Sequence, residues 1–309
     1  MVIFVNKGAR GGEGAARWRN VERELNRRRI SYEAETCQGI PQMRDAVSAY
    51  AGEGHDVMVA AGGDGTVNAL LNILMEKKVR PDAPNLILGA VGLGSSNDFH
   101  KPFSKERMLA GTPVRLSRDD ARLVDVGRVT LSTVGGGVET RYFFLNLSMG
   151  VVADSNARYN EGRGLSALKR HSVEAAILWA AFMALWHFAP VEVILQIDSQ
   201  KRKRTRVTNL HVLKKIHFAG GMRYDTEVTA DDGAFDVVCW ADMSRPRIIQ
   251  LVPRLYMGRV VGHRSVCVTR GKRIRLELAE AANLELDGEV VKATAADIEI
   301  LSRALMVCG

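Results

Sequence analysis

The sequence predicts an α/β domain followed by an all-β domain. Over residues 1–123, short apolar runs alternate with segments of helical periodicity. From residue 124 onward, paired runs alternate apolar with polar residues and are joined by turns. The first pattern is typical of a parallel sheet covered by helices, and the second of antiparallel hairpins. We therefore expect an α/β domain at 1–123 and an antiparallel β-sandwich at 124–300, with 301–309 as a candidate for a segment that returns to the first domain.

The first domain is expected to follow a βαβαβαβ order. Its strands are predicted from apolar runs at residues 2–5, 30–36, 56–61 and 86–91. Helices are expected between them, at 13–29, from about Pro41, and at 67–75. Ligands of such sheets bind at loops that follow the carboxyl ends of the strands. These loops are residues 6–14, 62–66 and 92–98, and all three are rich in glycine.

The second domain is predicted from alternation and from one strong turn. Residues 191–197 and 207–213 form one pair of runs, and 274–278 and 284–286 continue the pattern, with a last strand near 297–301. Asp287-Gly288 is a typical two-residue hairpin turn. A helix is expected at about 165–188. Its apolar part, residues 173–189, is marginal for crossing a bilayer, so a packed helix or one under a lipid pocket is favoured.

The overall charge favours acidic partners without choosing among them. The 309 residues carry a formal net charge of +8, which suits nucleic acid, phosphate ligands or an anionic membrane face. The basic run 201–206 reads first as a solvated hairpin tip and second as a contact with anionic lipid, worth about 1 kcal/mol per basic residue. Nucleic acid is not expected, because no aromatic residues are interleaved with the run and no recognition helix accompanies it.

Cysteine usage and the start of the chain bear on the compartment. The four cysteines are scattered and form no CxxC pair, so they indicate neither a disulfide framework nor a zinc site. The first residues read as a strand rather than as a signal peptide. We expect a cytoplasmic protein that is peripheral at the membrane.

The strongest local motif is Gly62-Gly63-Asp64-Gly65-Thr66, which lies between a buried strand and a helix. Its glycines allow the backbone to approach a phosphate closely, and the following helix directs its positive end at the same place. Asp64 can hold magnesium, and Thr66 can donate its hydroxyl to a phosphate oxygen. The alternative interpretation is that this segment is an ordinary tight turn that binds no ligand. There is no GxxxxGK[ST] sequence, and the protein-kinase motifs are missing too.

Two further segments end in a carboxylate. Residues 94–101 read GSSNDFHK and contain Asp98, and residues 125–128 read DVGR and begin with Asp125. Asp64, Asp98 and Asp125 would repel one another in a shared cleft unless a divalent cation or bound water satisfied them. Taken alone, Asp125 is an ordinary strand-end residue.

In this order, the motifs resemble the diacylglycerol kinase catalytic-domain family, which includes bacterial lipid kinases and the sphingosine and ceramide kinases. GGDGT is followed by a GTGNDFAR-like stretch, here GSSNDFHK, then by a DxGR-like segment, by DGAFD at 232–236 and by DGE at 287–289. The resemblance covers nearly the whole chain. It implies an α/β nucleotide domain of the NAD-kinase and phosphofructokinase type, a β-sandwich lipid domain, and an active site between them.

The resemblance also implies roles for single residues. ATP would be the co-substrate, and the residues at nucleotide-contacting positions are Asn6, Gly62, Gly63, Gly65, Thr66, Gly94, Ser95 and Asn97. Asp64, Asp98 and Asp125 match an aspartate–water–magnesium network. Asp232 and the carbonyl of Phe235 fall where bacterial members bind a structural magnesium. Glu289 matches the proposed general base, and we expect Asp64 to share in catalysis.

The base role has its own chemical reason, because an attacking alcohol must lose its proton, and a positioned base gives roughly 10²–10⁴-fold. By itself, Glu289 reads as an exposed hairpin residue. The chain departs from the family pattern at Lys7, Gly92 and Ser96 and lacks a proline before Asp232. These departures bear on loop geometry and lipid choice more than on the reaction.

Three functions are weighed. The first is an ATP-dependent lipid kinase acting on diacylglycerol or a similar lipid at an anionic membrane surface. An NAD kinase also carries GGDGT, but the GSSNDF and DGE segments and the apolar helix fit a lipid substrate better. A non-catalytic regulator that binds lipid or nucleotide is the third, although every candidate acid is present. The lipid, the preferred nucleotide and the oligomeric state, including a homodimer, are left open.

Overall fold

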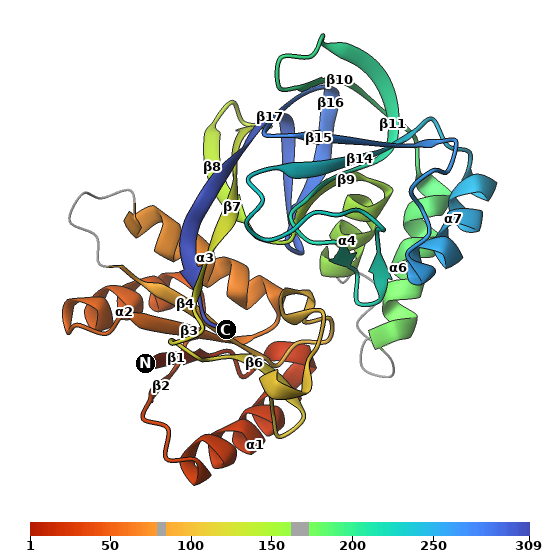
Figure 1. Cartoon of the computed structure of the whole chain (residues 1–309). Helices are drawn as coiled ribbons and strands as arrows, with labels where there is room; N and C mark the ends of the chain where they lie inside the picture. Colours follow the sequence, from red (N-terminus) through yellow and green to blue (C-terminus); the bar gives the residue numbers. More distant parts are fainter. Residues whose placement is uncertain (79–84, 162–172) are drawn as a thin grey trace. The chain divides into compact units, whose positions relative to one another are not determined.

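The computed structural model describes residues 1–78, 85–161 and 173–309. By contacts, the chain divides into two units (Figure 1). The first contains Met1–Val124 and Arg303–Gly309, and the second contains Asp125–Ser302. A chain with an α/β first part and a β-rich second part was expected from the sequence, and this coarse division of secondary structure is confirmed.

Strands and helices alternate through the first unit. Its strands and helices are β1 (Val2–Val5), η1 (Ala9–Gly12), α1 (Gly14–Arg27), β2 (Glu33–Thr36), α2 (Ile40–Gly52), β3 (Val57–Gly62), α3 (Asp64–Lys78), β4 (Ile87–Gly92), η2 (Asp98–His100), η3 (Lys105–Arg107), β5 (Met108–Leu109) and β6 (Thr112–Arg115). The second strand begins three residues later than the apolar pattern indicated, at Glu33, and most of its side chains are exposed.

The strand order in the first unit is β2-β1-β3-β4, with parallel pairing throughout. β17 (Glu289–Val307) brings the end of the chain back to this sheet, where Met306 lies opposite Ile87 in parallel register. β1 and β3 are buried along their whole length. The apolar face of α1, formed by Trp18, Val21 and Leu25, belongs to the same core cluster as residues of β1 and β3. The carboxyl ends of the four parallel strands β1, β2, β3 and β4 therefore lie at one edge of the sheet.

The second unit is mainly antiparallel sheet. Its strands and helices are β7 (Arg122–Thr133), β8 (Val138–Phe143), β9 (Asn146–Gly150), α4 (Val151–Glu161), α6 (Val173–His187), β10 (Val191–Ile197), β11 (Lys203–Leu213), β12 (His217–Phe218), β13 (Met222–Arg223), β14 (Phe235–Ala241), α7 (Arg245–Met257), β15 (Val266–Gly271), β16 (Arg273–Leu286) and the main part of β17. The first residues of the helix predicted at 165–188 lie outside the described residues.

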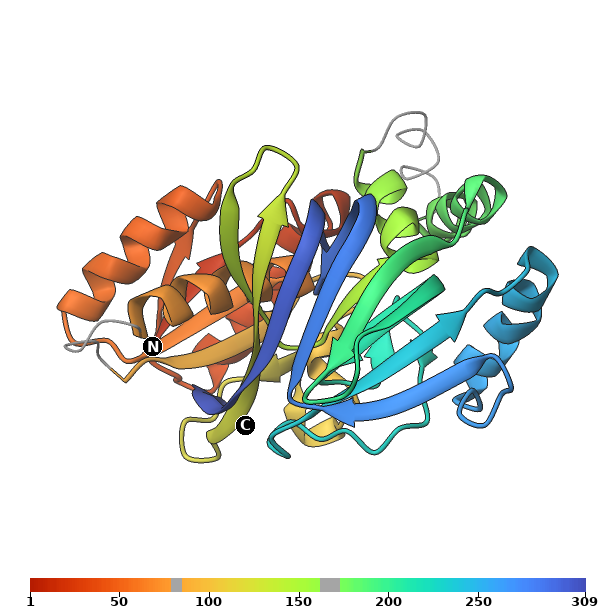
Figure 2. The ribbon, with the colours of Figure 1, turned by 90° about the horizontal axis from the view of Figure 1, so that it is seen from above.

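The strand order β15-β14-β11-β10-β16-β17 runs through the second unit, and β9 also pairs with β11 and β16. The long strands β16 and β17 run side by side in Figure 2 and are joined by the predicted turn at Asp287-Gly288. One core cluster is formed by buried side chains of the strands alone. A second core cluster packs α6 and α7 against β11 and β14. In the described ranges, no helix is long and apolar enough to cross a membrane.

Candidate functional site

The GGDGT segment forms a tight turn from β3 into α3. The carbonyl of Gly63 accepts the N–H groups of Thr66 at 2.9 Å and of Val67 at 3.2 Å, which closes the first helical turn. A Cβ at Gly62 would lie 2.2 Å from Oγ1 of Thr66, so only glycine fits there. Residues 63–65 are partly exposed at the start of a 15-residue helix. The N–H groups and positive end of such a helix favour an anion.

A second glycine turn packs directly on the first. A Cβ at Gly94 would lie 2.6 Å from Cα of Gly63, so the backbones of the two turns are in contact. Asn97 is buried in a left-handed conformation and donates its amide N–H groups to the carbonyls of Gly92 at 3.2 Å and Gly94 at 3.0 Å. Asn97 thus shapes this turn, whereas Ser95 is exposed at its tip.

Asn6 links the loop after β1 to the same edge. Its Nδ2 donates to Oγ1 of Thr66 at 3.0 Å, and its Oδ1 accepts the N–H of Gly8 at 3.1 Å. The predicted positions Asn6, Gly62–Thr66 and Gly94–Asn97 are therefore brought together within the first unit. Partly exposed backbone and a helix start make this edge a candidate phosphate site.

Asp64 ties the two turns together. Its carboxylate accepts the N–H of Asp98 at 3.1 Å on Oδ2 and that of Phe99 at 2.9 Å on Oδ1. Asp98 is buried, takes a hydrogen bond from the Ser96 hydroxyl, and lies 2.6 Å from Nζ of Lys101. Two of the predicted acids are thus neighbours in the first unit. The sequence reasoning missed Lys101 as the cation beside one of them.

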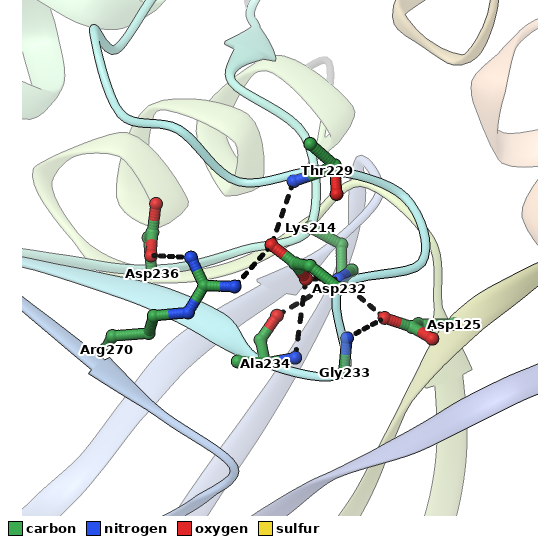
Figure 3. Close-up of polar contacts among 8 residues, drawn as sticks. All are labelled: Asp125, Lys214, Thr229, Asp232, Gly233, Ala234, Asp236 and Arg270. Carbon is green, nitrogen blue, oxygen red and sulfur yellow. Dashed lines mark hydrogen bonds and ion pairs between the residues drawn. The ribbon is translucent and has the colours of Figure 1, made fainter.

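Two further predicted acids, Asp125 and Asp232, lie around a lysine in the second unit (Figure 3). Nζ of Lys214 lies 2.9 Å from Oδ2 of Asp125, 2.7 Å from Oδ1 of Asp232 and 3.0 Å from the carbonyl oxygen of Ala234. Oδ2 of Asp125 also accepts the N–H of Gly233 at 2.7 Å. We call Asp125, Lys214, Asp232, Gly233 and Ala234 the Lys214 cluster.

Arg270 closes the outer side of the Lys214 cluster. Its Nη2 lies 2.6 Å from Oδ2 of Asp232, which also accepts the N–H of Thr229 at 3.1 Å. Burial acts to raise the pKa of Asp232, but the hydrogen bonds from Lys214 and Thr229 outweigh it, and the pKa falls below its ordinary value. The carbonyl predicted to bind a metal was that of Phe235. In the structure, the carbonyl oxygen that accepts from Nζ of Lys214 is that of Ala234, one residue earlier, and the Phe235 ring stacks on Phe143.

Glu289 is exposed at the start of β17, and its turn is held by two buried acids. Asp287 accepts the N–H groups of Phe144, Leu145 and Asn146 at 2.8–3.1 Å. Glu285 accepts the Ser148 hydroxyl at 2.6 Å and the N–H of Gly288 at 2.5 Å. The conformation at Glu289 is therefore anchored through its neighbours.

Glu285 and Lys214 were not predicted. Glu285 follows the ordinary strand alternation with Leu284 and Leu286 and reads as a surface residue, yet all three are buried. Lys214 follows an apolar strand and carries no motif. Lys214 is revealed by its contacts with Asp125 and Asp232, and Glu285 by its contacts with Ser148 and Gly288. Neither set of contacts can be predicted from one sequence.

Comparison with known proteins decides the family. Residues 1–129 match the model of the diacylglycerol kinase catalytic domain, and residues 146–309 match that of the YegS C-terminal NAD kinase beta sandwich-like domain. The chain belongs to the diacylglycerol kinase catalytic-domain family. It is a lipid kinase of this family, as the order of its motifs predicted.

Curated relatives agree with that placement, and a solved structure shares the fold. The diacylglycerol kinase of Bacillus subtilis is 24% identical over 262 residues, which cover 84% of this chain and 78% of the relative. That of Mycobacterium tuberculosis is 24% identical over 272 residues, or 85% and 80% of the two chains. A diacylglycerol kinase structure from Bacillus anthracis shares the fold, with a TM-score of 0.66, 15% identity and coverage of 99% and 95%.

Proposed function

We propose that this lipid kinase transfers the terminal phosphate of ATP to the hydroxyl of diacylglycerol or a closely similar lipid. The contact between the Gly63 and Gly94 backbones carries the proposal, because it builds a side-chain-free surface at the start of α3. Such a surface suits the β- and γ-phosphates of a nucleotide. The lipid acceptor rests on the family and on the names of its relatives.

In this proposal, Asp64 is the principal residue that holds magnesium. Asp64 is partly exposed beside the glycine turns, and its carboxylate offers the hard oxygens that magnesium prefers. Asp98 is the weaker candidate, since Lys101 already lies 2.6 Å from its Oδ1. Bound magnesium would neutralise charge on the phosphate oxygens. Within this chain, the N–H groups at the start of α3 and the Thr66 hydroxyl would orient the triphosphate.

Glu289 is proposed as the general base that takes the proton from the lipid hydroxyl. It is exposed, and the buried acids Glu285 and Asp287 hold its turn by hydrogen bonds. A carboxylate on a backbone held in this way can act as a general base when the acceptor hydroxyl lies within hydrogen-bond reach. We expect Glu289→Gln to bind nucleotide as the wild type does and to lose transfer by roughly 10²–10⁴-fold.

The deciding assay uses labelled ATP and a panel of acceptors. Diacylglycerol, monoacylglycerol, phosphatidylglycerol and a sphingoid base are presented in vesicles, and NAD is tested in solution. The matched control is Glu280→Gln, because Glu280 is also an exposed glutamate of the same unit. Wild-type transfer in Glu289→Gln would reject the base assignment, phosphorylation of NAD alone would favour the NAD kinase, and ATP turnover with no acceptor would favour a regulator.

Binding at an anionic membrane surface is proposed through α6 and α7. Trp179, Phe182 and Trp186 follow one another on the exposed side of α6, with ring centroids 5.9 and 6.1 Å apart, and they are 51–62% exposed. On α7, Ile249 and Tyr256 are more than half exposed. Aromatic rings and apolar side chains of this kind insert at the level of lipid head groups.

Charge around α7 supports an anionic lipid as the partner. From residue 243 to residue 276 the sequence has no aspartate or glutamate. The arginines in and directly after the helix are exposed: Arg245, Arg247, Arg254, Arg259 and Arg264. By contrast, the basic hairpin tip at 201–206 has Arg204 paired with Glu192 at 2.6 Å and Arg202 paired with Glu277. We therefore place the anionic contact at α7 rather than at the hairpin.

Vesicle sedimentation tests this surface. Wild-type protein should bind vesicles with phosphatidylglycerol and not vesicles of phosphatidylcholine alone. The double variant Arg247→Glu/Arg254→Glu should lose most binding, because each basic residue near such a surface contributes about 1 kcal/mol. Lys201→Glu in the hairpin tip is the control and should bind normally. If Lys201→Glu lost vesicle binding and the double variant kept it, the membrane contact would lie at the hairpin instead of at α7.

A further inference from the structure

The Lys214 cluster lies where the family resemblance implies a structural magnesium, and its geometry is that of a different cation. Lysine has three N–H donors and no acceptor. Nζ of Lys214 has three oxygen acceptors at 2.7–3.0 Å, one each from Asp125, Asp232 and Ala234. These are hydrogen-bond lengths for an ammonium group, whereas magnesium requires about six oxygens at about 2.0–2.1 Å.

The centre of the cluster is buried, although Asp232 is partly exposed. Lys214 and Asp125 are 1% and 2% exposed, so the ammonium and one of its carboxylates are out of water. A buried charge persists only when it is paired and hydrogen-bonded. Three carboxylates, Asp125, Asp232 and Asp236, face two basic groups, Lys214 and Arg270, and the formal charge of these five side chains sums to −1. A dication added to this set would bring an excess of one positive charge beside the buried ammonium group.

The backbone is shaped around the ammonium group. The N–H of Lys214 donates to the carbonyl of Leu145 at 2.9 Å, which fixes the lysine at the end of β11. On the other side, the turn at 232–234 has Gly233 at φ +69°, a conformation that favours glycine, and its N–H donates to Asp125. The turn therefore encloses Nζ from the side of Asp232 and Ala234 (Figure 3).

We propose that the ammonium group of Lys214 is the built-in cation of the second unit and takes the place of a structural magnesium ion at Asp232. The residues present do not fit magnesium while this lysine is in place. The second unit therefore folds without a divalent ion at this position. The inference stands apart from the proposed reaction, because it concerns stability and can be measured with no nucleotide or lipid present.

Thermal melting of the full chain in EDTA and in magnesium tests the proposal. The change in melting temperature between 1 mM EDTA and about 10 mM MgCl₂ should be the same for the wild type and for Asp232→Asn, within about 1 °C, because any magnesium held at Asp64 would act on both proteins alike. A wild type stabilised by magnesium, with the effect abolished in Asp232→Asn, would show that the cluster binds the metal in spite of Lys214 and would overturn the proposal.

Removing the lysine gives the sharper arm of the test. Lys214→Ser removes the ammonium group from beside Asp125 and Asp232, so the variant should melt at least 5 °C lower in EDTA. The space that the shorter side chain leaves should admit a cation, so MgCl₂ or methylammonium chloride should restore stability. Lys201→Ser, an exposed lysine of the same unit, is the control and should respond to neither. A Lys214→Ser protein as stable as the wild type in EDTA would overturn the proposal. If this variant fails to fold, the wild-type and Asp232→Asn comparison decides.

Discussion

Two pairs of aspartates in this lipid kinase are surrounded in different ways. Asp64 and Asp98 lie at the glycine turns of the first unit, where Asp64 is partly exposed and accepts backbone N–H groups. Asp125 and Asp232 lie around Lys214, whose ammonium group is 1% exposed. Each pair has one buried aspartate, Asp98 or Asp125, and one that is partly exposed. The difference is therefore the cation, because Asp125 and Asp232 share the buried ammonium group of Lys214. The difference separates a candidate reaction site from a structural centre.

The largest expected effect concerns Asp125 and Asp232, the pair that shares Lys214. Lys214→Met leaves Asp125 and Asp232 without their ammonium partner, and breaking a buried pair in this way costs about 3–5 kcal/mol. Lys101→Met beside Asp98 should cost less, about 1–3 kcal/mol, because the Ser96 hydroxyl still donates to that carboxylate. Denaturant unfolding measures both, with Lys201→Met as an exposed control that should change stability by less than about 0.5 kcal/mol. Equal losses for Lys214→Met and Lys101→Met would remove the contrast between the pairs.

The next largest effect concerns Asp64, at the glycine turns. Asp64→Asn removes the negative charge beside the glycine turns and should lower phosphate transfer by about 10²-fold, which corresponds to about 2.7 kcal/mol in the barrier. Its cost to stability should be near 1 kcal/mol, since the amide keeps one acceptor for the N–H groups of Asp98 and Phe99. Rates of lipid phosphorylation and melting curves give the two numbers.

Asp45→Asn is the matched control for this substitution. Asp45 is an exposed acid of α2 in the same unit. It should leave both the rate and the melting curve unchanged. If Asp64→Asn transferred phosphate within about threefold of the wild type, Asp64 would not be the residue that holds magnesium.

Much of this arrangement follows from local sequence. The glycine turns were predicted because strand, Gly-Gly-Asp-Gly and helix periodicity follow one another within one short segment. The hairpin at Asp287-Gly288 was predicted for the same reason, since the turn and both strands are adjacent in the chain. Local pattern also indicated the apolar face of α1, where Trp18, Val21 and Leu25 recur at helical spacing.

The parts that could not be predicted depend on distant residues. Lys214 contacts Asp125, 89 positions earlier in the chain, and Asp287 binds backbone N–H groups more than 140 positions away. No period or motif encodes such pairs. Asn97 shows a second limit, because its amide donates to carbonyls of its own turn, which no motif indicated. Its contact with a nucleotide stays a prediction. A polar residue in a ligand-like motif can be there to shape the backbone.

The smallest expected effect comes from a second buried polar group of the second unit, and it has its own pH window. His211 of β11 is fully buried beside Phe218 and Tyr224, and burial lowers its pKa to about 3. Between pH 6.5 and 3 the unfolded chain binds a proton there that the folded chain does not, so stability is full above pH 6.5 and falls with pH. One proton gives a slope of at most about 1.4 kcal/mol per pH unit.

Denaturant midpoints at pH 7, 6 and 5 should fall accordingly in the wild type and less steeply in His211→Gln. His55→Gln, beside Glu33 in the first unit, is the control. Parallel pH profiles for wild type and His211→Gln would show that His211 is not the group that titrates.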